Sequence, residues 1–430
     1  MKVIRKAIAQ AVRITLLRLV RYLAILSFVV TPTAAQTPAE KPSMKDFGSS
    51  LKKLKWDPVK QVSIETDPAR TRRNGSADVD VVRVETDLVV FDAQVRDRQG
   101  RVITGLTQND FVVRDNGERQ TIGHFSLGSD LTVPRSIVLI IDYSGSLRSY
   151  LDQSIDAAEV LIGQLGPKDR IAIVTDDVKQ LSDFTGDKKA LTKALESLRK
   201  KAKERHFGSS FQLTALMATV RELFSQEDIR PIVIFQTDGD EVGLLQPPDP
   251  RYYFTSEIPA NARPELKKML ESMNQKLRKG IEALYKPFSL QDVYKAIEKS
   301  HATVYTIIPG QQLVGIPNDQ QYARVRASVQ PEYSDEQARD ITFCYVRAQT
   351  AAANAAIVSG GWVAFLNKPD QAGDIYATIL SDINSRYVIG YYPTNKVHDG
   401  RRRSVSLEVS GHPDYVLSGR RTYYAPEPEP

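Results

Sequence analysis

Cysteine and histidine are scarce in this 430-residue chain, which has one cysteine and five histidines. The lone Cys344 excludes a disulfide framework within the chain, and its ordinary role is that of a small buried apolar residue. The histidines are scattered and form no His-Glu-x-x-His pattern, and the sequence contains no nucleophile elbow and no glycine-rich phosphate loop. Because the common enzyme signatures are missing, we expect the protein not to be an enzyme.

Positive charge is in excess only at the N-terminus. The chain has 58 lysines and arginines against 52 acids, a formal net charge of +6. Residues 1–35 contain six of the basic residues and no acid, so without them 52 basic side chains face 52 acidic ones. A neutral chain has no surplus charge with which to attract a polyanion. We therefore expect no nucleic-acid partner.

The first 35 residues have the features of an export signal. A basic start is followed by an apolar stretch at 22–30 and by small residues at 31–35. We predict a signal peptide at 1–35 and an exported protein, located in the periplasm or outside the cell. The alternative is an uncleaved anchor in the inner membrane, although Arg18 and Arg21 interrupt the apolar run. Membrane contact is expected only in that case.

Composition and periodicity divide the rest of the chain. Residues 36–80 are rich in Pro, Lys, Ser and Asp without sustained periodicity, which predicts a disordered linker. Apolar and polar side chains alternate at 89–95, as in a half-buried strand, and this alternation returns near the C-terminus. The further predicted segments are an N-terminal β module at 81–130, an α/β domain at 131–370 with an insertion at 240–287, a C-terminal helix and β ribbon at 371–425, and a tail at 426–430.

Strand-like and helix-like segments alternate after Pro134, which predicts a mainly parallel sheet wrapped by helices. Residues 136–141 form a continuous apolar run, typical of a strand buried on both faces. Further strands are predicted at 171–175, 231–235 and 303–308. The expected fold class is α/β and Rossmann-like, flanked by small β modules.

Acids and hydroxyls follow two of these strands. Asp142, Ser144 and Ser146 come directly after the first strand, and Asp238 follows a later one. Between them, Thr214 lies near the start of a predicted helix. The carboxyl ends of parallel strands meet at one edge of a sheet, where open α/β sheets bind ligands. Carboxylate and hydroxyl oxygens at that edge are the donors that a small hard cation prefers.

This pattern resembles the metal-ion-dependent adhesion site of von Willebrand factor type A (VWFA) domains, which combines an Asp-x-Ser-x-Ser loop with a later Thr and a later Asp. The resemblance implies the fold of these domains and a bound Mg²⁺, or Mn²⁺ or Ca²⁺ in its place. It also implies the metal ligands Asp142, Ser144, Ser146, Thr214 and Asp238. Residues 84–125 and 386–423 further resemble the front and closing segments of the VWFA-related family described from acidobacteria.

The segment before Thr214 departs from the family pattern. Family members have Gly-Gly-Thr here, whereas residues 210–213 of this chain are Ser-Phe-Gln-Leu. Ser209 and Ser210 are therefore alternative ligands to Thr214.

The resemblance implies recognition of a protein partner rather than turnover. Mg²⁺ takes six oxygens, and this set of side chains leaves a position to water, which an Asp or Glu of a partner can replace. The predicted insertion leaves the sheet at the same edge, so Asp240, Tyr252, Tyr253 and Phe254 are candidates for the binding surface. An amphipathic helix later in the insertion either adds to that surface or packs on the domain's own core.

Two other functions stay open at this point. One is a structural scaffold of the cell envelope, in which the metal site is vestigial. The other is a Mg²⁺-dependent hydrolase, for which Asp240 is the nearest candidate for a general base beside Asp142 and Asp238. Binding that survives both a chelator and Asp142→Ala would favour the scaffold, and turnover of phosphate or acyl esters would favour the hydrolase.

Overall fold

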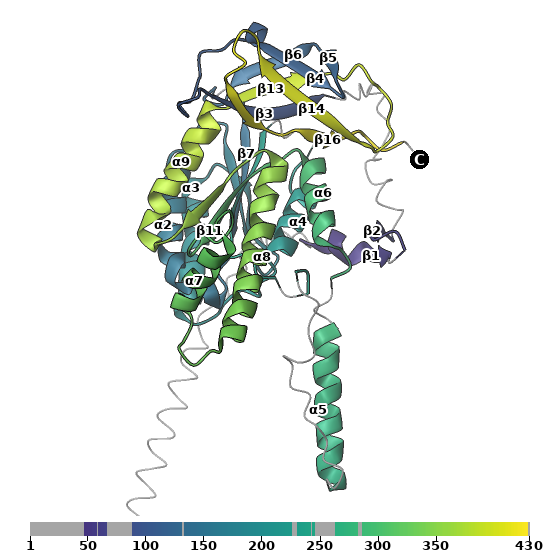
Figure 1. Ribbon diagram of the computed structural model, residues 1–430, viewed down its shortest axis with the longest axis vertical. Coiled ribbons are helices and arrows are strands. Elements are labelled where there is room, and N and C mark those ends of the chain that lie inside the picture. The colour runs from purple at the N-terminus through teal and green to yellow at the C-terminus, as the bar shows by residue number, and fades with distance from the viewer. Residues whose placement is uncertain are drawn as a thin grey trace, which may run out of the picture. The chain divides into compact units, whose positions relative to one another are not determined.

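The computed structural model describes residues 47–57, 59–66, 88–130, 133–225, 230–241, 243–245, 263–282 and 286–428. The predicted signal peptide and most of the predicted linker lie outside these residues, as do Tyr252, Tyr253 and Phe254. Within them the chain forms an α/β domain and a β-sandwich (Figure 1).

A six-stranded sheet forms the centre of the α/β domain. In spatial order it consists of β12 (Val363–Leu366), β11 (Thr303–Pro309), β10 (Arg230–Gln236), β7 (Arg135–Ile141), β8 (Arg170–Thr175) and β9 (Lys179–Thr185). All seven residues of β7 are buried, which explains its continuous apolar sequence. These strands run parallel except for the edge strand β9. The strand order reverses between β7 and β10, which is the usual ligand-binding position in such sheets.

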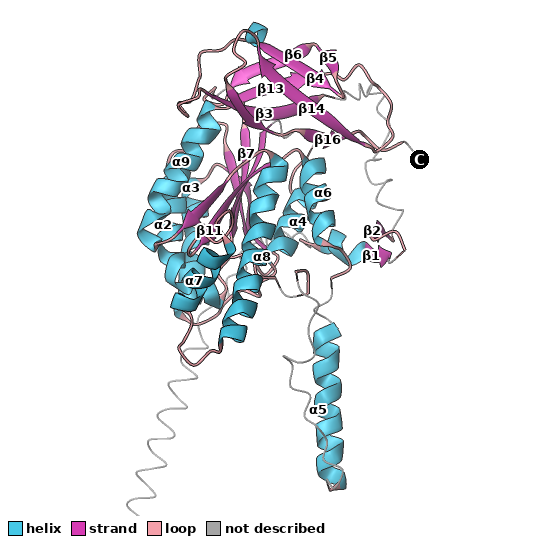
Figure 2. Ribbon diagram, viewed as in Figure 1, coloured by secondary structure: helices cyan, strands magenta, loops and turns pink. Residues whose placement is uncertain are grey.

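Helices cover both faces of this sheet (Figure 2). Ile137 and Leu139 of β7 pack on one set of helices, and Val138 and Ile140 pack on the other, because successive strand residues point to opposite faces. The first set is α2 (Arg148–Gly163), α3 (Lys188–Lys203) and α9 (Ala372–Ser385). The second set is α4 (Gln212–Glu222), α6 (Leu290–Ser300) and α8 (Asp335–Ser359).

Local sequence signals fix the ends of two of these helices. Ser289 before α6 and Ser334 before α8 each form a capping box with the first turn of the helix. Helix α8 ends at Gly360, which has a φ of 83° and would bring a Cβ within 2.3 Å of Arg420 N. Glycine is required there for both reasons.

The N-terminal and C-terminal β segments form one domain. One sheet consists of β15 (Val416–Gly419), β3 (Val89–Arg96), β13 (Tyr387–Tyr391) and β6 (Ile122–Leu127). The other consists of β16 (Thr422–Tyr424), β14 (Arg402–Val409), β4 (Phe111–Asp115) and β5 (Glu118–Gln120). The two sheets share one core, because each buries its apolar face against the other. The separate modules predicted at 81–130 and 371–425 are therefore corrected to a single β-sandwich (Figure 1).

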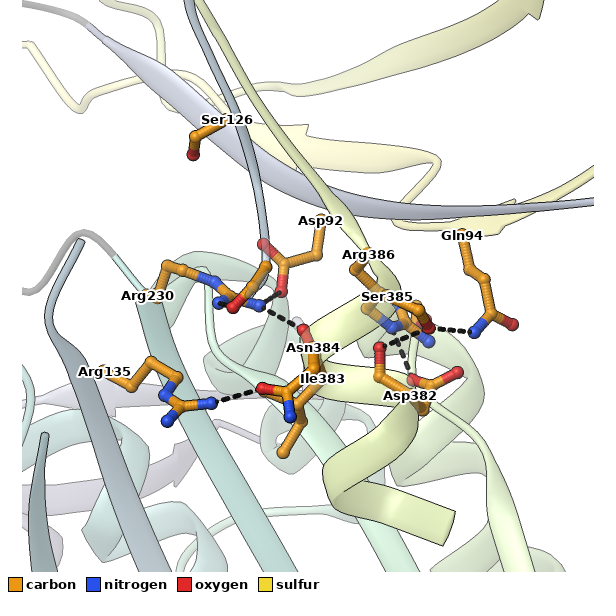
Figure 3. Close-up of polar contacts among 12 residues, drawn as sticks. Asp92, Gln94, Ser126, Arg135, Arg230, Asp382, Ile383, Asn384, Ser385 and Arg386 are labelled. Atoms are coloured by element: carbon orange, nitrogen blue, oxygen red, sulfur yellow. Dashed lines mark hydrogen bonds and ion pairs between the residues drawn. The ribbon is translucent and has the colours of Figure 1, made fainter. Parts of the chain in front are cut away.

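Buried arginines fix the sandwich to the amino end of the α/β sheet (Figure 3). Arg230 opens β10 and donates to Asp92 Oδ2 of β3 at 3.1 Å. It also donates to the backbone oxygens of Gly128 and Ile383, both at 3.0 Å. The carboxyl ends of the strands, where the predicted ligands lie, are at the opposite edge of the sheet.

The boundary between the α/β domain and the last β strands lies near Arg386 rather than at residue 370. Tyr376, Ile379 and Ile383 of α9 belong to the core of the α/β domain. Arg386 is buried and donates to Asp382 Oδ2 at 2.6 Å, so the end of α9 is held by an ion pair before β13 begins. The helix that was grouped with the C-terminal ribbon is thus part of the α/β domain.

Part of the predicted linker is structured, so the prediction of disorder over 36–80 is wrong for residues 47–66. The elements there are η1 (Ser49–Lys53), β1 (Leu54–Asp57) and β2 (Val62–Glu65). Leu51 and Leu54 are buried in the core that contains α4. The backbone N–H groups of Gly48 and Ser50 both donate to Glu222 at 2.9 Å. These contacts tie the segment to the α/β domain, although its composition is that of a linker.

Several short elements lie outside the main pattern. The edge strand β9 and the helix α7 (Asn318–Ser328) were not predicted from the sequence. The buried residue of α7 is Val325. One buried side chain does not produce an apolar stripe, so the sequence gives no periodic signal for this helix. Cys344, expected to be buried, is half-buried on α8. The remaining short helical elements are the turns η3 (Gln108–Asp110), η4 (Gly145–Leu147) and η6 (Pro369–Gln371).

Candidate metal-binding site

Four of the five predicted ligands meet where β7 and β10 end. The two strands are parallel neighbours, so Asp142 and Asp238 leave the sheet at the same edge. Ser144 N donates to Asp142 Oδ1 at 2.9 Å, and Ser146 Oγ donates to Asp238 Oδ2 at 2.7 Å. The hydroxyl oxygens of the two serines lie 3.0 Å apart. We call these four residues the strand-end cluster.

The cluster runs from the interior to the surface. Asp142 and Ser144 are buried, Asp238 is half-buried and Ser146 is exposed. The loop that carries the serines turns directly into η4 and α2, which holds it in place against the sheet. A ligand can therefore reach the cluster from the side of Ser146 and Asp238.

Gln212, which was not predicted as a site residue, joins the two acids. It is the first residue of α4 and its side chain is buried. Its Nε2 donates to Asp142 Oδ2 at 2.8 Å and to Asp238 Oδ1 at 3.1 Å. Its Oε1 is buried and has no hydrogen-bond partner. The sequence did contain a signal for this residue: the family's Gly-Gly-Thr is absent here, so a different residue type, Gln212, begins the helix.

Thr214 is held by a residue outside the cluster. Its hydroxyl and its backbone N–H both donate to Glu241, the backbone contact at 2.9 Å. Glu241 is fully buried, burial raises its pKa, and Lys286 Nζ lies 3.5 Å from its Oε1. The structure therefore ties Gln212, rather than Thr214, to the acids of the cluster. Of the alternative ligands, Ser209 is exposed, and Ser210 donates its backbone N–H to Asp176 at 2.8 Å.

Asp176, at the end of β8, is a second site residue that the sequence analysis missed. It is fully buried and accepts hydrogen bonds from the backbone N–H groups of Tyr143 and Ser210, at 3.1 and 2.8 Å. A Cβ on Gly208 would lie 2.0 Å from its carboxylate, so only glycine fits at that position. Asp176 thus fixes the loop after β7 to the loop before α4.

Four acids lie close together at this edge of the sheet. Burial raises the pKa of Asp142, and the nearby carboxylates of Asp238 and Asp176 raise it further. Burial likewise raises the pKa of Asp240, with Asp238 as a second cause. Uncompensated negative charge of this kind is relieved when a cation binds between the carboxylates.

The donor set of the cluster fits a hard divalent cation. Two carboxylates and two hydroxyls converge, and all of their ligating atoms are oxygens, as Mg²⁺, Mn²⁺ and Ca²⁺ prefer. In the described part of the chain, no group of three or more His, Cys, Asp or Glu side chains has a metal-binding arrangement. A cation here would consequently depend on the serine hydroxyls as well as on the two acids.

A cavity of about 520 Å³ opens beside the cluster. Its lining includes Ser146, Asp238 and Asp240 together with residues of α7 and α8, among them Arg324 and Tyr345. Burial raises the pKa of the Tyr345 hydroxyl, and the carboxylates of Asp240 and Asp238 raise it further. Asp240 thus lies on the predicted binding side.

The helix predicted in the insertion is present as α5 (Pro264–Glu282). Leu266, Met269 and Met273 are 42%, 52% and 51% exposed. Over this part of the helix, the apolar stripe is therefore not packed on the domain's own core. The aromatic run at 252–254 lies outside the described residues, so its place in the binding surface stays a prediction.

Residues 137–241 match the sequence model of the von Willebrand factor type A domain, so this part of the chain is similar to that family. The matched stretch contains the whole strand-end cluster together with Gln212 and Asp176. It does not reach the β-sandwich, so the finer likeness to the acidobacterial family stays a prediction. A comparison with curated protein sequences gives no match.

Solved structures that match part of this chain come from several organisms. The von Willebrand domain of the type V pili tip protein Mfa5 from Porphyromonas gingivalis is 15% identical, with a TM-score of 0.34, over 59% of this chain and 95% of that one. An aerotolerance-related membrane protein from Bacteroides fragilis is 13% identical, with a TM-score of 0.32, over 59% and 98%. Proximal thread matrix protein 1 from the mussel byssus, solved with a zinc-occupied MIDAS motif, is 15% identical, with a TM-score of 0.31, over 58% of this chain and 48% of its own. This chain thus spans about half of the mussel protein, and identities this low concern the fold alone.

Proposed function

We propose that this protein is an exported binding protein that captures a carboxylate of a protein partner, as in cell adhesion, through a divalent cation at the strand-end cluster. The observation that carries the proposal is the convergence of two acids and two hydroxyls beside a cavity of about 520 Å³. All of the ligating atoms are oxygens, which suits Mg²⁺ and also Mn²⁺ or Ca²⁺.

Asp142, Ser144, Ser146 and Asp238 would hold the cation, which when bound offers an open coordination position to a carboxylate. The backbone N–H of Ser144 fixes the buried carboxylate of Asp142. Ser146 and Asp238 line the cavity, so the open side of the site faces it. The cavity has room for the remainder of the partner's acidic residue.

The proposal is one of binding without turnover. The polar side chains at the cluster are acids, hydroxyls and an amide that contact one another. Asp240 is the one candidate for a base that the sequence suggested, and its backbone N–H donates to Asp238 Oδ1 at 3.1 Å. Metal-dependent hydrolysis of a phosphate or acyl ester that is lost in Asp142→Ala would contradict this part of the proposal.

Export is proposed from the basic and apolar character of residues 1–35. Within the described part of the chain, no helix combines the length and apolar character needed to cross a bilayer. Labelling of the mature N-terminus after expression in a bacterial host would distinguish cleavage near residue 35 from an uncleaved anchor.

Peptide selection on the full chain tests the binding proposal. Peptides displayed on phage and selected in millimolar Mg²⁺ should share an Asp or Glu, and replacing that acid by Asn or Gln should abolish binding. Binding should also disappear in EDTA and in Asp142→Ala. Selected peptides that lack an acid, or that bind equally well in EDTA, would refute a metal-bridged carboxylate.

The second candidate is a scaffold with a vestigial metal site. The observation in its favour is Gln212, because its amide N–H groups already lie between the two acids, where a cation would bind. In that case partner binding would persist in EDTA and in Asp142→Ala.

A further inference from the structure

The two ends of the Gln212 amide have different surroundings. The side chain is 1% exposed and reaches the strand-end cluster from the first position of α4. The Nε2 atom donates to both Asp142 and Asp238, so both of its N–H groups are used. The Oε1 atom is buried without a hydrogen-bond partner.

A buried carbonyl oxygen without a partner is rare in folded proteins and requires a physical reason. A half-turn about the last side-chain bond of Gln212 exchanges its Oε1 and Nε2 atoms. Without a cation, that turn would aim the oxygen at two carboxylates and would be repulsive. With a cation between the acids, the same oxygen becomes a further hard ligand, as the amide carbonyls of Asn and Gln are for Ca²⁺. Each orientation therefore suits one state of the site.

Thr214, the ligand implied by the family resemblance, is engaged elsewhere. Glu241 accepts hydrogen bonds from both its hydroxyl and its backbone N–H. Lys286 pairs with Glu241 at 3.5 Å, and its Nζ also lies 3.6 Å from the centre of the Phe211 ring. This buried arrangement holds Thr214, while Gln212 is the residue of α4 whose side chain reaches both acids.

We propose that Gln212 is a ligand of the divalent cation through Oε1, and that its amide makes a half-turn when the cation binds or leaves. This inference rests on the proposed function, because it adds a ligand to the same site. Without the cation, the two N–H groups stand in for the missing positive charge between Asp142 and Asp238. The half-turn thus keeps the buried acids paired in both states.

Isothermal titration of the full chain with Mg²⁺ tests the assignment. Gln212→Leu keeps most of the side-chain volume and removes the ligand, so we expect its Kd to be at least tenfold weaker than that of the wild type. Thr214→Val, two residues along the same helix, is the matched control and should stay within threefold. Gln212→Glu presents oxygen at both ends and should bind at least as tightly as the wild type. Near-UV circular dichroism checks that each variant is folded.

A second readout follows the amide itself. The side-chain ¹H–¹⁵N signals of Gln212 can be identified by their loss in Gln212→Leu. In the wild type they should shift when Mg²⁺ is added, because their N–H groups leave two carboxylates. In Asp142→Ala they should not respond to Mg²⁺.

The outcomes separate this inference from the proposed function. If the wild type binds no Mg²⁺, the proposed metal site fails and the role of Gln212 fails with it. If the wild type binds Mg²⁺ and Asp142→Ala does not, but folded Gln212→Leu binds as tightly as the wild type or tighter, the metal site stands and Gln212 is not a ligand. Loss of binding in folded Gln212→Glu would also overturn the inference, and this variant decides the question if Gln212→Leu does not fold.

Discussion

Replacing Arg230 by Met should destabilise the protein by about 3–5 kcal/mol, because it breaks the buried junction between the β-sandwich and the α/β domain. The side chains of Arg230 and Asp92 are 1% and 9% exposed. Met fills similar space but donates no hydrogen bond. Asp92 would remain as a buried charge without its partner, and the backbone oxygens of Gly128 and Ile383 would each lose a donor.

The magnitude follows from these lost contacts. Removing one member of a buried ion pair costs about 3–5 kcal/mol, since the other charge stays in the interior. A natural domain is typically stable by only about 5–15 kcal/mol, so the loss would be a large share of the total. Because the contacts of Arg230 with Asp92 and Gly128 cross the junction, the sandwich should also unfold before the α/β domain in this variant.

Urea unfolding at 25 °C, followed by two signals, tests both statements. Far-UV circular dichroism reports on both domains, whereas both tryptophans, Trp56 and Trp362, lie outside the sandwich strands. In Arg230→Met the circular dichroism transition should begin at lower urea than the fluorescence transition. Arg199→Met is the control: Arg199 pairs with three acids on the surface, whose side chains are 50–65% exposed, and its loss should cost less than about 1 kcal/mol.

A loss below about 1 kcal/mol in Arg230→Met, or one equal to that of Arg199→Met, would refute the reasoning. The double variant Arg230→Met with Asp92→Leu sharpens the test. Removing both charges should recover most of the stability, because an apolar pair of similar volume leaves no buried charge.

Burial lowers the pKa of His301 to about 4, below the unfolded value of about 6.5, so the unfolded chain binds the proton first and stability falls as the pH drops between these values. Between about pH 7.5 and about pH 5, the free energy of unfolding of the wild type, measured by urea titration, should fall by about 1–2 kcal/mol, whereas that of His301→Asn should not show this fall. Equal changes of stability with pH in the two proteins would show that His301 is not the group responsible. Asn tolerates the positive φ of 57° at this position. Gly208→Ala brings a Cβ within 2.0 Å of the Asp176 carboxylate and should destabilise the protein by about 2 kcal/mol or more. Gly163→Ala in α2 is the control, because the space around Gly163 is open, and it should be neutral or slightly stabilising. Similar urea midpoints for the two variants would contradict the loop geometry. Mn²⁺ at 100 times its Kd should stabilise the full chain by about 2.7 kcal/mol in thermal unfolding, and the proposed site would be refuted if Asp142→Ala responded equally.

The α/β sheet and most of its site could be predicted because their signals are local. The apolar run before Asp142 marks a strand buried on both faces, and Ser144 and Ser146 follow it directly. Parallel pairing then brings Asp238 to the same edge without further information. The sheet, its wrapping helices and the four residues of the strand-end cluster follow from these facts.

The remaining features depend on contacts that sequence spacing does not encode. Whether Gln212 or Thr214 faces the acids depends on where α4 begins, and element ends are the least certain part of any prediction from sequence. The role of Glu241 depends on a buried contact between the loop after β10 and Thr214 in the first turn of α4. The structure at residues 47–66 also depends on distant contacts. Leu51 alone gives no periodic pattern in the sequence, but it packs into a core formed mostly by distant segments.

The α/β domain is inserted within the sandwich, since it lies in the chain between β6 and β13, which are hydrogen-bonded neighbours. Forming the sandwich first would mean closing a loop that contains the whole α/β domain, at an entropic cost of about 5 kcal/mol. Folding of the α/β domain first shortens that loop to a short gap, because Arg386 joins the end of α9 directly to β13. During synthesis, β3 and β6 therefore cannot pair with β13 until the C-terminal residues have left the ribosome. The topology thus favours an order of folding in which the α/β domain is complete before the sandwich whose first strands precede it in the chain.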